Sequence, residues 1–261
     1  MSYLDINGLS LYYEEQGAGG TPLVLLHGGM AGGEIFAGLL PALSEGRRVI
    51  VPDLQGHGRT AEIDRPLRPE HLAGDIAALI EHLGLERADV VGYSLGGAVA
   101  LRLAVEHPER VRRLVLVSTA ARRDGSFPEV VAAMDAMSAE MAPMMQGSPA
   151  YQHYAEVAPR SEDWTTHVGR TAELLKVDYD WTAEFAAIQA PAMLVYADGD
   201  SVRPDHIVEL WGLLGGGQRD AGWDGSARPQ SRLAILPGAT HYDIYMSPLL
   251  VPAIVPFLDE A

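Results

Sequence analysis

The segment ADVVGYSLGGAVALRLA, residues 88–104, is the most informative part of this sequence for predicting its fold. An apolar run that ends at Val91 is typical of a buried strand, and the segment after Ser94 has the spacing of a helix. A turn from strand to helix within a few residues forces its apex residue into a strained conformation. Gly92 and Gly96, two positions either side of Ser94, leave room for that conformation. The stretch therefore predicts a sharp turn that presents Ser94 at a helix N-terminus, where free N–H groups favour negative charge.

The rest of the chain alternates strand-like and helix-like segments. Asn7-Gly8, between two runs of alternating polar and apolar residues, is typical of a β-hairpin. Six later strands are expected within residues 21–28, 47–54, 88–94, 111–119, 190–200 and 231–241. Helical patterns cover residues 68–86 and 96–110, and others begin near residues 205 and 248. This order predicts an α/β fold with a mostly parallel eight-stranded sheet, an N-terminal antiparallel hairpin and helices on both faces.

One interval is too long for a simple crossover between parallel strands. About seventy residues separate the strand that ends near Ala120 from the strand that starts near Pro191, so we expect an inserted helical cap. The expected division is a core of residues 1–120 and 188–261 and a cap of residues 121–187. Five methionines in the insert are spaced by three and four residues, which predicts one face of a helix: Met134, Met137, Met141, Met144 and Met145. That face either packs against neighbouring helices or forms a pliable wall over a substrate pocket.

The composition excludes several classes of function. With 19 Lys+Arg against 35 Asp+Glu among 261 residues, the net charge is −16, which would repel nucleic acid and an anionic membrane surface. The absence of cysteine excludes disulfides and thiolate chemistry, and the histidines show no metal-binding spacing. We therefore expect no metal, no cofactor, no nucleic-acid partner and no membrane partner. The N-terminal sequence lacks the pattern of a signal peptide, so we expect a cytoplasmic protein, either a monomer or a homodimer.

The G-x-S-x-G pattern of residues 92–96, between a strand and a helix, resembles the nucleophile elbow of the α/β-hydrolase fold family. A serine hydroxyl needs a base and an orienting acid, and the family's chain order is serine, acid, histidine. His241, in the segment ILPGATHYDIYMSP, follows a late strand where the family places its base. In LVYADGDSVRP the resemblance implies that Asp200, the second aspartate, orients the histidine, and we expect Asp198 to cap a turn.

Two glycine-rich loops extend this resemblance. The segment His27-Gly28-Gly29-Met30 resembles the family's HG motif and implies that the N–H groups of Gly29 and Leu95 bind the oxyanion, with Met30 as the alternative donor. We expect His27 to hold its loop by hydrogen bonds, and DLQGHGRT, residues 53–60, to form a tight turn. The expected substrate-binding residues are Met30, Tyr93, Met137, Met141 and Tyr154.

The resemblance implies a serine hydrolase that cleaves carboxylic esters, lactones among them, of a mostly apolar small molecule through an acyl-enzyme. Carbon–carbon bond hydrolases and cofactor-free perhydrolases use the same triad, and both remain alternatives. The loop GGGQRDAGWDG and the segment LPGATHY resemble a subgroup that includes macrolide esterases. A ligand-binding receptor on a hydrolase scaffold is the alternative from another class. We expect the glycine-rich loop of residues 213–232 to lie far from Ser94.

Overall fold

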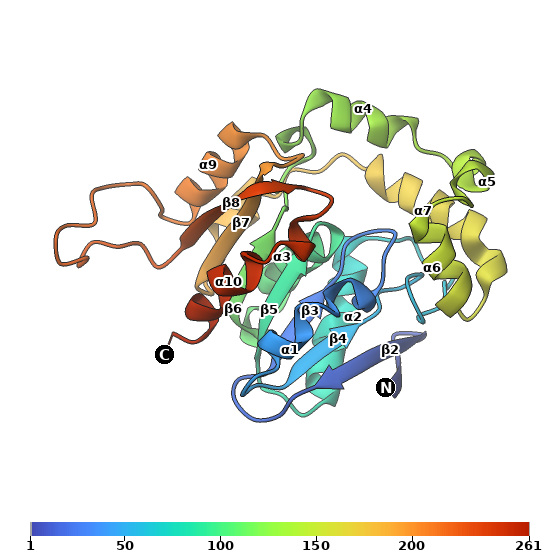
Figure 1. Ribbon diagram of the computed structural model, residues 1–261, viewed down its shortest axis with the longest axis horizontal. Coiled ribbons are helices and arrows are strands. Elements are labelled where there is room, and N and C mark those ends of the chain that lie inside the picture. The colour runs from blue at the N-terminus through green and yellow to red at the C-terminus, as the bar shows by residue number, and fades with distance from the viewer. Residues whose placement is uncertain (1, 261) are drawn as a thin grey trace.

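The computed structural model describes residues 2–260, and its centre is one sheet with the strand order β1-β2-β4-β3-β5-β6-β7-β8 (Figure 1). The strands are β1 (Ser2–Ile6), β2 (Leu9–Gln16), β3 (Leu23–Leu26), β4 (Val49–Pro52), β5 (Ala88–Tyr93), β6 (Val111–Val117), β7 (Ala192–Gly199) and β8 (Arg232–Thr240). The β1–β2 hairpin and the β2–β4 pair are antiparallel, and every pair from β4 to β8 is parallel. The predicted fold class is confirmed.

Helices cover both faces of the sheet because successive side chains of a strand point to opposite sides. Val24 and Leu26 of β3 belong to the core under α2 and α3, whereas Leu23 and Leu25 belong to the core under α1 and α10. The helices around the sheet are α1 (Leu40–Leu43), α2 (Pro69–His82), α3 (Leu95–Glu106), α8 (Thr182–Ala186), α9 (Pro204–Leu213) and α10 (Leu250–Leu258). Short 3-10 helices lie at Gly33–Phe36, Pro108–Arg110, Arg123–Gly125, Ala139–Met141, Ser161–Asp163 and Ile244–Met246.

The expected cap range, residues 121–187, is helical. Besides α8 it contains α4 (Pro128–Ala136), α5 (Ala142–Met145), α6 (Pro149–Val157) and α7 (Trp164–Leu175), and these four helices gather at one side of the molecule (Figure 1). Three of them, α5, α6 and α7, share a small core made of Ala142, Tyr154, Trp164 and Val168. The indole N–H of Trp164 donates to the carbonyl of Ala142 at 3.0 Å, which ties α7 to α5.

The prediction of one methionine-lined helix is wrong. Met134 lies in α4, but Met137 ends that helix in an extended conformation (φ −65°, ψ 135°), and Ser138 is also extended. A short 3-10 helix follows at Ala139–Met141, and the next α-helix starts only at Ala142, with Pro143, which has no N–H to donate, in its first turn. The five methionines therefore come from three short segments, and Met144 is 75% exposed.

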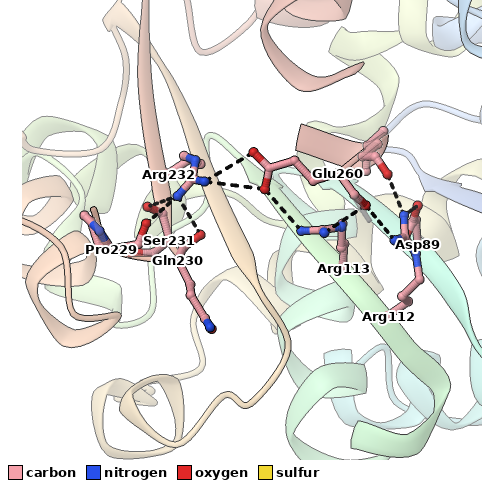
Figure 2. A network of polar contacts seen from close by, with 9 residues as sticks. Asp89, Arg112, Arg113, Pro229, Gln230, Ser231, Arg232 and Glu260 are labelled. Atoms are coloured by element: carbon pink, nitrogen blue, oxygen red, sulfur yellow. Dashed lines mark hydrogen bonds and ion pairs between the residues drawn. The ribbon is translucent and has the colours of Figure 1, made fainter. Parts of the chain in front are cut away.

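Polar contacts fasten the C-terminal segment to the edge of the sheet where the parallel strands begin (Figure 2). Arg112, near the start of β6, donates from Nε and Nη2 to the two carboxylate oxygens of the fully buried Asp89 at 2.8 and 2.7 Å. Its Nη2 also donates to the carbonyl of Leu258 at 2.5 Å, at the end of α10. Arg232, the first residue of β8, pairs with Glu260 at 3.2 Å. These contacts give this edge of the sheet a structural role.

The glycine-rich loop between α9 and β8 extends away from the body of the molecule, on the side opposite the cap helices (Figure 1). It leaves from the edge where β8 begins, and Trp223 within it is fully exposed. Within residues 2–260, none of the helices combines the length and the apolar character that crossing a membrane requires.

Candidate active site

Four polar residues occupy equivalent positions at the carboxyl edge of the sheet. Ser94, Ser118, Asp200 and His241 are each the first residue after a strand, namely β5, β6, β7 and β8. These strands are parallel and adjacent in that order, so their carboxyl ends meet at one edge. Three of the four residues were predicted from the sequence. Ser118 was missed, and its signal was its place directly after a buried strand.

The turn at Ser94 has the strained geometry expected from its glycines. Ser94 has φ 53° and ψ −115°, and its N–H donates to the carbonyl of Val117 at 3.0 Å. A Cβ at Gly92 would lie 2.2 Å from the carbonyl oxygen of Gly96, and a Cβ at Gly96 would lie 2.1 Å from that of Leu26. Both approaches are sterically forbidden, so the turn requires glycine at these positions. A strained residue held in this way is typical of a functional site.

The side chains of Ser94, His241 and Asp200 form a continuous chain of contacts. Ser94 Oγ lies 3.1 Å from His241 Nε2, and His241 Nδ1 lies 3.2 Å from Asp200 Oδ1. The Asp200 side chain is 1% exposed and that of His241 is 16% exposed. The hydroxyl of Tyr93 donates to the His241 carbonyl at 2.7 Å, which anchors the loop that carries the imidazole. The structure thus brings the three predicted residues together in the predicted order.

Hydrogen bonds keep the carboxyl group of Asp200 in its charged form. Burial alone would raise the pKa of Asp200, but hydrogen bonds from His241, Ser118 and the Ala197 amide outweigh it and lower the pKa. Ser118 Oγ donates to Oδ2 at 2.5 Å and Ala197 N–H donates to the same oxygen at 3.0 Å. The carboxylate is therefore a fixed negative charge beside the imidazole.

A second group also contacts the imidazole. Ser201 Oγ lies 2.8 Å from His241 Nδ1, closer to that nitrogen than Asp200 Oδ1. No sequence pattern predicted this contact, because a serine after an aspartate in a loop is common and usually caps a turn.

The two predicted oxyanion donors are neighbours. Leu95 is the first residue of α3, where a helix leaves its N–H groups without intrahelical partners. A Cβ at Gly29 would lie 3.9 Å from Leu95 Cδ2, so the main chain of Gly29 passes directly beside Leu95. Within residues 2–260, neither the Gly29 nor the Leu95 N–H has a hydrogen-bond partner. Met30, next in the chain, has a left-handed backbone with φ 61°.

Buried polar groups hold the loop around Gly29. His27, as predicted, is structural: its Nε2 accepts from Leu54 N–H at 3.0 Å, and its Nδ1 bonds the Gly28 carbonyl at 2.8 Å. Burial lowers the pKa of His27, which keeps the ring neutral. Asp53 accepts from the N–H groups of Gly33 and Arg59 at 2.7 and 2.8 Å. These contacts confirm that residues 53–60 form a tight turn.

A comparison with known families agrees with this geometry. Residues 21–163 match the family model described as alpha/beta hydrolase fold. The chain belongs to this family. The matched range includes Gly29 and Ser94 but ends before Asp200 and His241, so the assignment of those two residues rests on their contacts with Ser94.

The chain is also similar to hydrolases of known name and to a solved hydrolase structure. The chain is 32% identical over 208 residues to a pimeloyl-[acyl-carrier protein] methyl ester esterase from Aromatoleum aromaticum, a match that covers 70% of this chain and 80% of the esterase. It is 40% identical over 121 residues to a 2-hydroxymuconate semialdehyde hydrolase from Pseudomonas sp., but the match spans only 41% of that protein and 43% of this chain. The crystal structure of a hydrolase from Pseudomonas aeruginosa PA01 is similar with a TM-score of 0.73 and 26% identity, covering 99% of this chain and 98% of the other.

In this alpha/beta hydrolase the expected substrate-binding residues do not all lie together. Met30, Met137 and Tyr154 meet in one apolar cluster, because Met30 and Met137 pack against the cap core that contains Tyr154. Tyr154 is buried there and stacks on His167 with ring centroids 5.2 Å apart. Tyr93 is also buried, but it lies in the core beside His241 rather than in the cap cluster. Met141 is half-buried in the 3-10 helix before α5.

A pocket of about 380 Å³ lies beside Asp200 and Ser201. It opens between the start of α4 and the start of α9, and Phe127, Val130 and Tyr242 form apolar parts of its wall. Among the described residues, Ser94 and His241 do not line it. This pocket therefore lies next to Asp200 rather than next to Ser94.

Proposed function

We propose that this chain is a serine hydrolase that cleaves carboxylic esters through an acyl-enzyme intermediate. The observation that carries the proposal is the chain of contacts from Ser94 to His241 to Asp200, at 3.1 and 3.2 Å, beside the N–H groups of Gly29 and Leu95, which have no hydrogen-bond partner among the described residues. Such an arrangement activates a hydroxyl and stabilises the negative charge that develops when the hydroxyl attacks a carbonyl carbon.

Each proposed step uses a group whose position is known. Ser94 Oγ attacks the ester carbonyl while His241 Nε2 takes its proton, and the oxyanion accepts hydrogen bonds from Gly29 and Leu95 N–H. The imidazolium then gives its proton to the leaving alkoxide, and the alcohol departs. Water attacks the acyl-enzyme with the same proton transfers, which releases the acid and restores the serine. Asp200 holds the imidazole in the tautomer that leaves Nε2 free to accept a proton.

The apolar side chains near Gly29 favour a substrate whose acyl or alcohol group is mostly apolar. Met30 follows the proposed oxyanion donor Gly29 and packs against the cap cluster of Tyr154 and Trp164, so the donor and this apolar surface are contiguous. Methionine adapts its shape to irregular ligands. We infer that Met30, Met137 and Met141 contact the substrate. Truncation of Met137 to alanine then raises KM several-fold and leaves kcat nearly unchanged, because a uniform binding contact is lost.

The relatives support hydrolysis in general but do not single out ester bonds. One relative is named for a methyl ester and another for a semialdehyde, so family membership alone leaves the bond open. A panel of short-acyl p-nitrophenyl esters, lactones, macrolides and dicarbonyl compounds, with and without hydrogen peroxide, separates esterase from carbon–carbon hydrolase and perhydrolase. The proposal expects its fastest turnover on esters or lactones. If the chain binds members of the panel without turning them over, the alternative of a ligand-binding receptor on a hydrolase scaffold would be favoured.

The proposal is tested by the turnover of p-nitrophenyl butyrate. Ser94→Ala lowers kcat by about 10⁴-fold, because it removes the nucleophile and leaves only the oxyanion site and binding. Ser231→Ala is the matched control, because that serine precedes β8 at the opposite edge of the sheet. Ester turnover that survives Ser94→Ala at the wild-type rate would refute the proposal.

A further inference from the structure

The Nδ1 atom of His241 has two partners, and the proposed mechanism uses only one of them. Ser201 Oγ lies 2.8 Å from Nδ1, whereas Asp200 Oδ1 lies 3.2 Å from it. A neutral imidazole carries one proton, and Nε2 must be unprotonated to accept the proton of Ser94. The single Nδ1 proton therefore lies between a hydroxyl and a carboxylate, and the hydroxyl is the nearer group.

The carboxylate decides the direction of the contact with Ser201. A hydroxyl can donate to an unprotonated Nδ1 or accept from a protonated one, but an ionised carboxylate can only accept. An unprotonated Nδ1 would face a lone pair of Asp200 Oδ1 at 3.2 Å, which is repulsive. Nδ1 is therefore protonated, and Ser201 Oγ accepts its hydrogen bond.

Asp200 has little capacity left for the imidazole. Its Oδ2 accepts from Ser118 Oγ and Ala197 N–H, and its Oδ1 accepts from Val202 N–H at 3.2 Å as well as from the imidazole. Four donors fill the roughly four acceptor sites of a carboxylate. Sharing one oxygen with the Val202 amide accounts for the long 3.2 Å contact to Nδ1. A second acceptor for the same proton then contributes to the orientation of the ring.

The main chain holds Ser201 in place. Its carbonyl accepts from Phe127 N–H at 3.1 Å, and Arg203 N–H donates to the Gly125 carbonyl at 2.9 Å. Val202 also forms a β-bridge with Ser126. The residues that lead into the cap thus pair with the loop that carries Ser201, and Ser201 itself is 9% exposed. A side chain fixed in this way can orient its neighbour without a large loss of entropy.

We propose that Ser201 is a positioning residue that shares the Nδ1–H of His241 with Asp200 and aims Nε2 at Ser94. The proposal rests on the proposed function. Ser201 orients the neutral imidazole before the reaction, and the carboxylate of Asp200 stabilises the imidazolium that forms when Ser94 loses its proton. Ser201 and Asp200 together thus provide the orientation and the charge stabilisation that the acid alone would otherwise provide.

The first test compares two variants of nearly equal shape. Ser201→Thr keeps the hydroxyl and Ser201→Val removes it. Loss of one hydrogen bond to the imidazole lowers kcat about 5- to 10-fold in Ser201→Val with KM unchanged, and Ser201→Thr restores most of the rate. Equal kcat values in the two variants, with both folded by circular dichroism, would overturn the proposal.

The second test asks whether Ser201 replaces Asp200 when the acid is absent. In the wild-type background Asp200 still holds Nδ1 after Ser201→Val, but in an Asp200→Ala background no acceptor remains. The fold-loss in kcat caused by Ser201→Val therefore rises by at least about tenfold in Asp200→Ala, as expected for residues that share one partner. A fold-loss that is the same in both backgrounds indicates a purely structural role for Ser201 and would overturn the proposal.

A third readout does not depend on turnover. In ¹⁵N-histidine-labelled protein, the Nδ1–H proton resonance of His241 moves downfield in Ser201→Val, because its remaining acceptor is a charged carboxylate and the bond strengthens. A resonance at the same position in both proteins contradicts the shared hydrogen bond. This readout stands even if the chain hydrolyses no ester, so it separates a failure of this inference from a failure of the proposed function.

Discussion

Ser118 Oγ donates a hydrogen bond to Asp200 Oδ2 at 2.5 Å, although the two residues are 82 positions apart in the chain. Ser118 is 2% exposed and has a left-handed backbone, with φ 51°. Its N–H donates to the Val195 carbonyl at 2.9 Å, which fixes it against β7. The contact orients the carboxylate toward His241, and it joins the end of β6 to a site otherwise built from β5, β7 and β8.

Replacement of Ser118 should therefore leave the Asp200 carboxylate in place but hold it less firmly toward His241. Ser118→Ala lowers kcat for ester hydrolysis about tenfold, because a hydrogen bond to a charged group contributes about 1.5–3 kcal/mol. Thr119→Val is the matched control, since its buried hydroxyl donates to the Val117 carbonyl instead of to Asp200. Steady-state kinetics of the two folded variants check this. Equal kcat values would show that Ser118 does not position the acid.

The two aspartates of the segment ADGD should differ sharply in their effect on the rate. Asp200→Asn lowers kcat about 10³- to 10⁴-fold, because an amide beside Nδ1 favours the wrong tautomer of the imidazole. Asp198 is exposed and accepts main-chain N–H bonds from Gly238 and Ala239 at 2.9 and 3.3 Å. Asp198→Asn keeps a carbonyl acceptor there and changes kcat by about twofold or less. The reverse order of effects would assign the acid to Asp198.

The lowered pKa of Asp200 predicts how its contribution to stability depends on pH. The folded chain holds the carboxyl proton less tightly than the unfolded chain, so the charged group stabilises the fold above the ordinary aspartate pKa. That contribution is lost as the pH falls through the lower folded value. The difference in free energy of unfolding between the wild type and Asp200→Asn should shrink from pH 7 toward pH 4 and below. Urea titrations measure it, and a difference that widens on acidification would contradict the assignment.

Two glycine-to-alanine substitutions should have opposite effects on stability. A Cβ at Gly96 would lie 2.1 Å from the Leu26 carbonyl oxygen, so Gly96→Ala forces β3 and α3 apart and costs about 3 kcal/mol or more. Gly74, inside α2, has no atom within 4 Å of an added Cβ. Gly74→Ala therefore stabilises the fold by about 0.5–1 kcal/mol. Thermal melts of the pair check both signs, and a stable Gly96→Ala would contradict the described turn.

The sequence predicted the strands well because buried parallel strands are continuous apolar runs, and all eight were expected in their observed places. It also predicted Ser94, Asp200 and His241, because each lies at the end of a strand-like run and the resemblance to the α/β-hydrolase fold family implies the order serine, acid, histidine. Ser118 follows a strand in the same way, but its role depends on β6 lying beside β7, and strand neighbours are not local information. The contact of Ser201 with His241 likewise depends on a loop conformation that no local pattern encodes.

The methionines of the cap show the limit of periodicity. Spacings of three and four are expected for a helix face, yet the extended backbone at Met137 and Ser138 interrupts the helix between Met134 and Met141. Pro143 was visible in the sequence as a residue that disfavours a helix interior. Because the stripe is divided among three segments, the cap can place Met137 and Met145 against its core while Met144 faces solvent.

Covalent trapping by a p-nitrophenyl phosphonate tests whether His241 activates Ser94 as a nucleophile. Attack of Ser94 Oγ on phosphorus expels one p-nitrophenolate per chain, and peptide mass spectrometry should locate the phosphonyl group on Ser94. His241→Ala should slow the labelling at least about 100-fold, because the general base is lost. A label on another residue, or labelling at an unchanged rate in His241→Ala, would contradict the account.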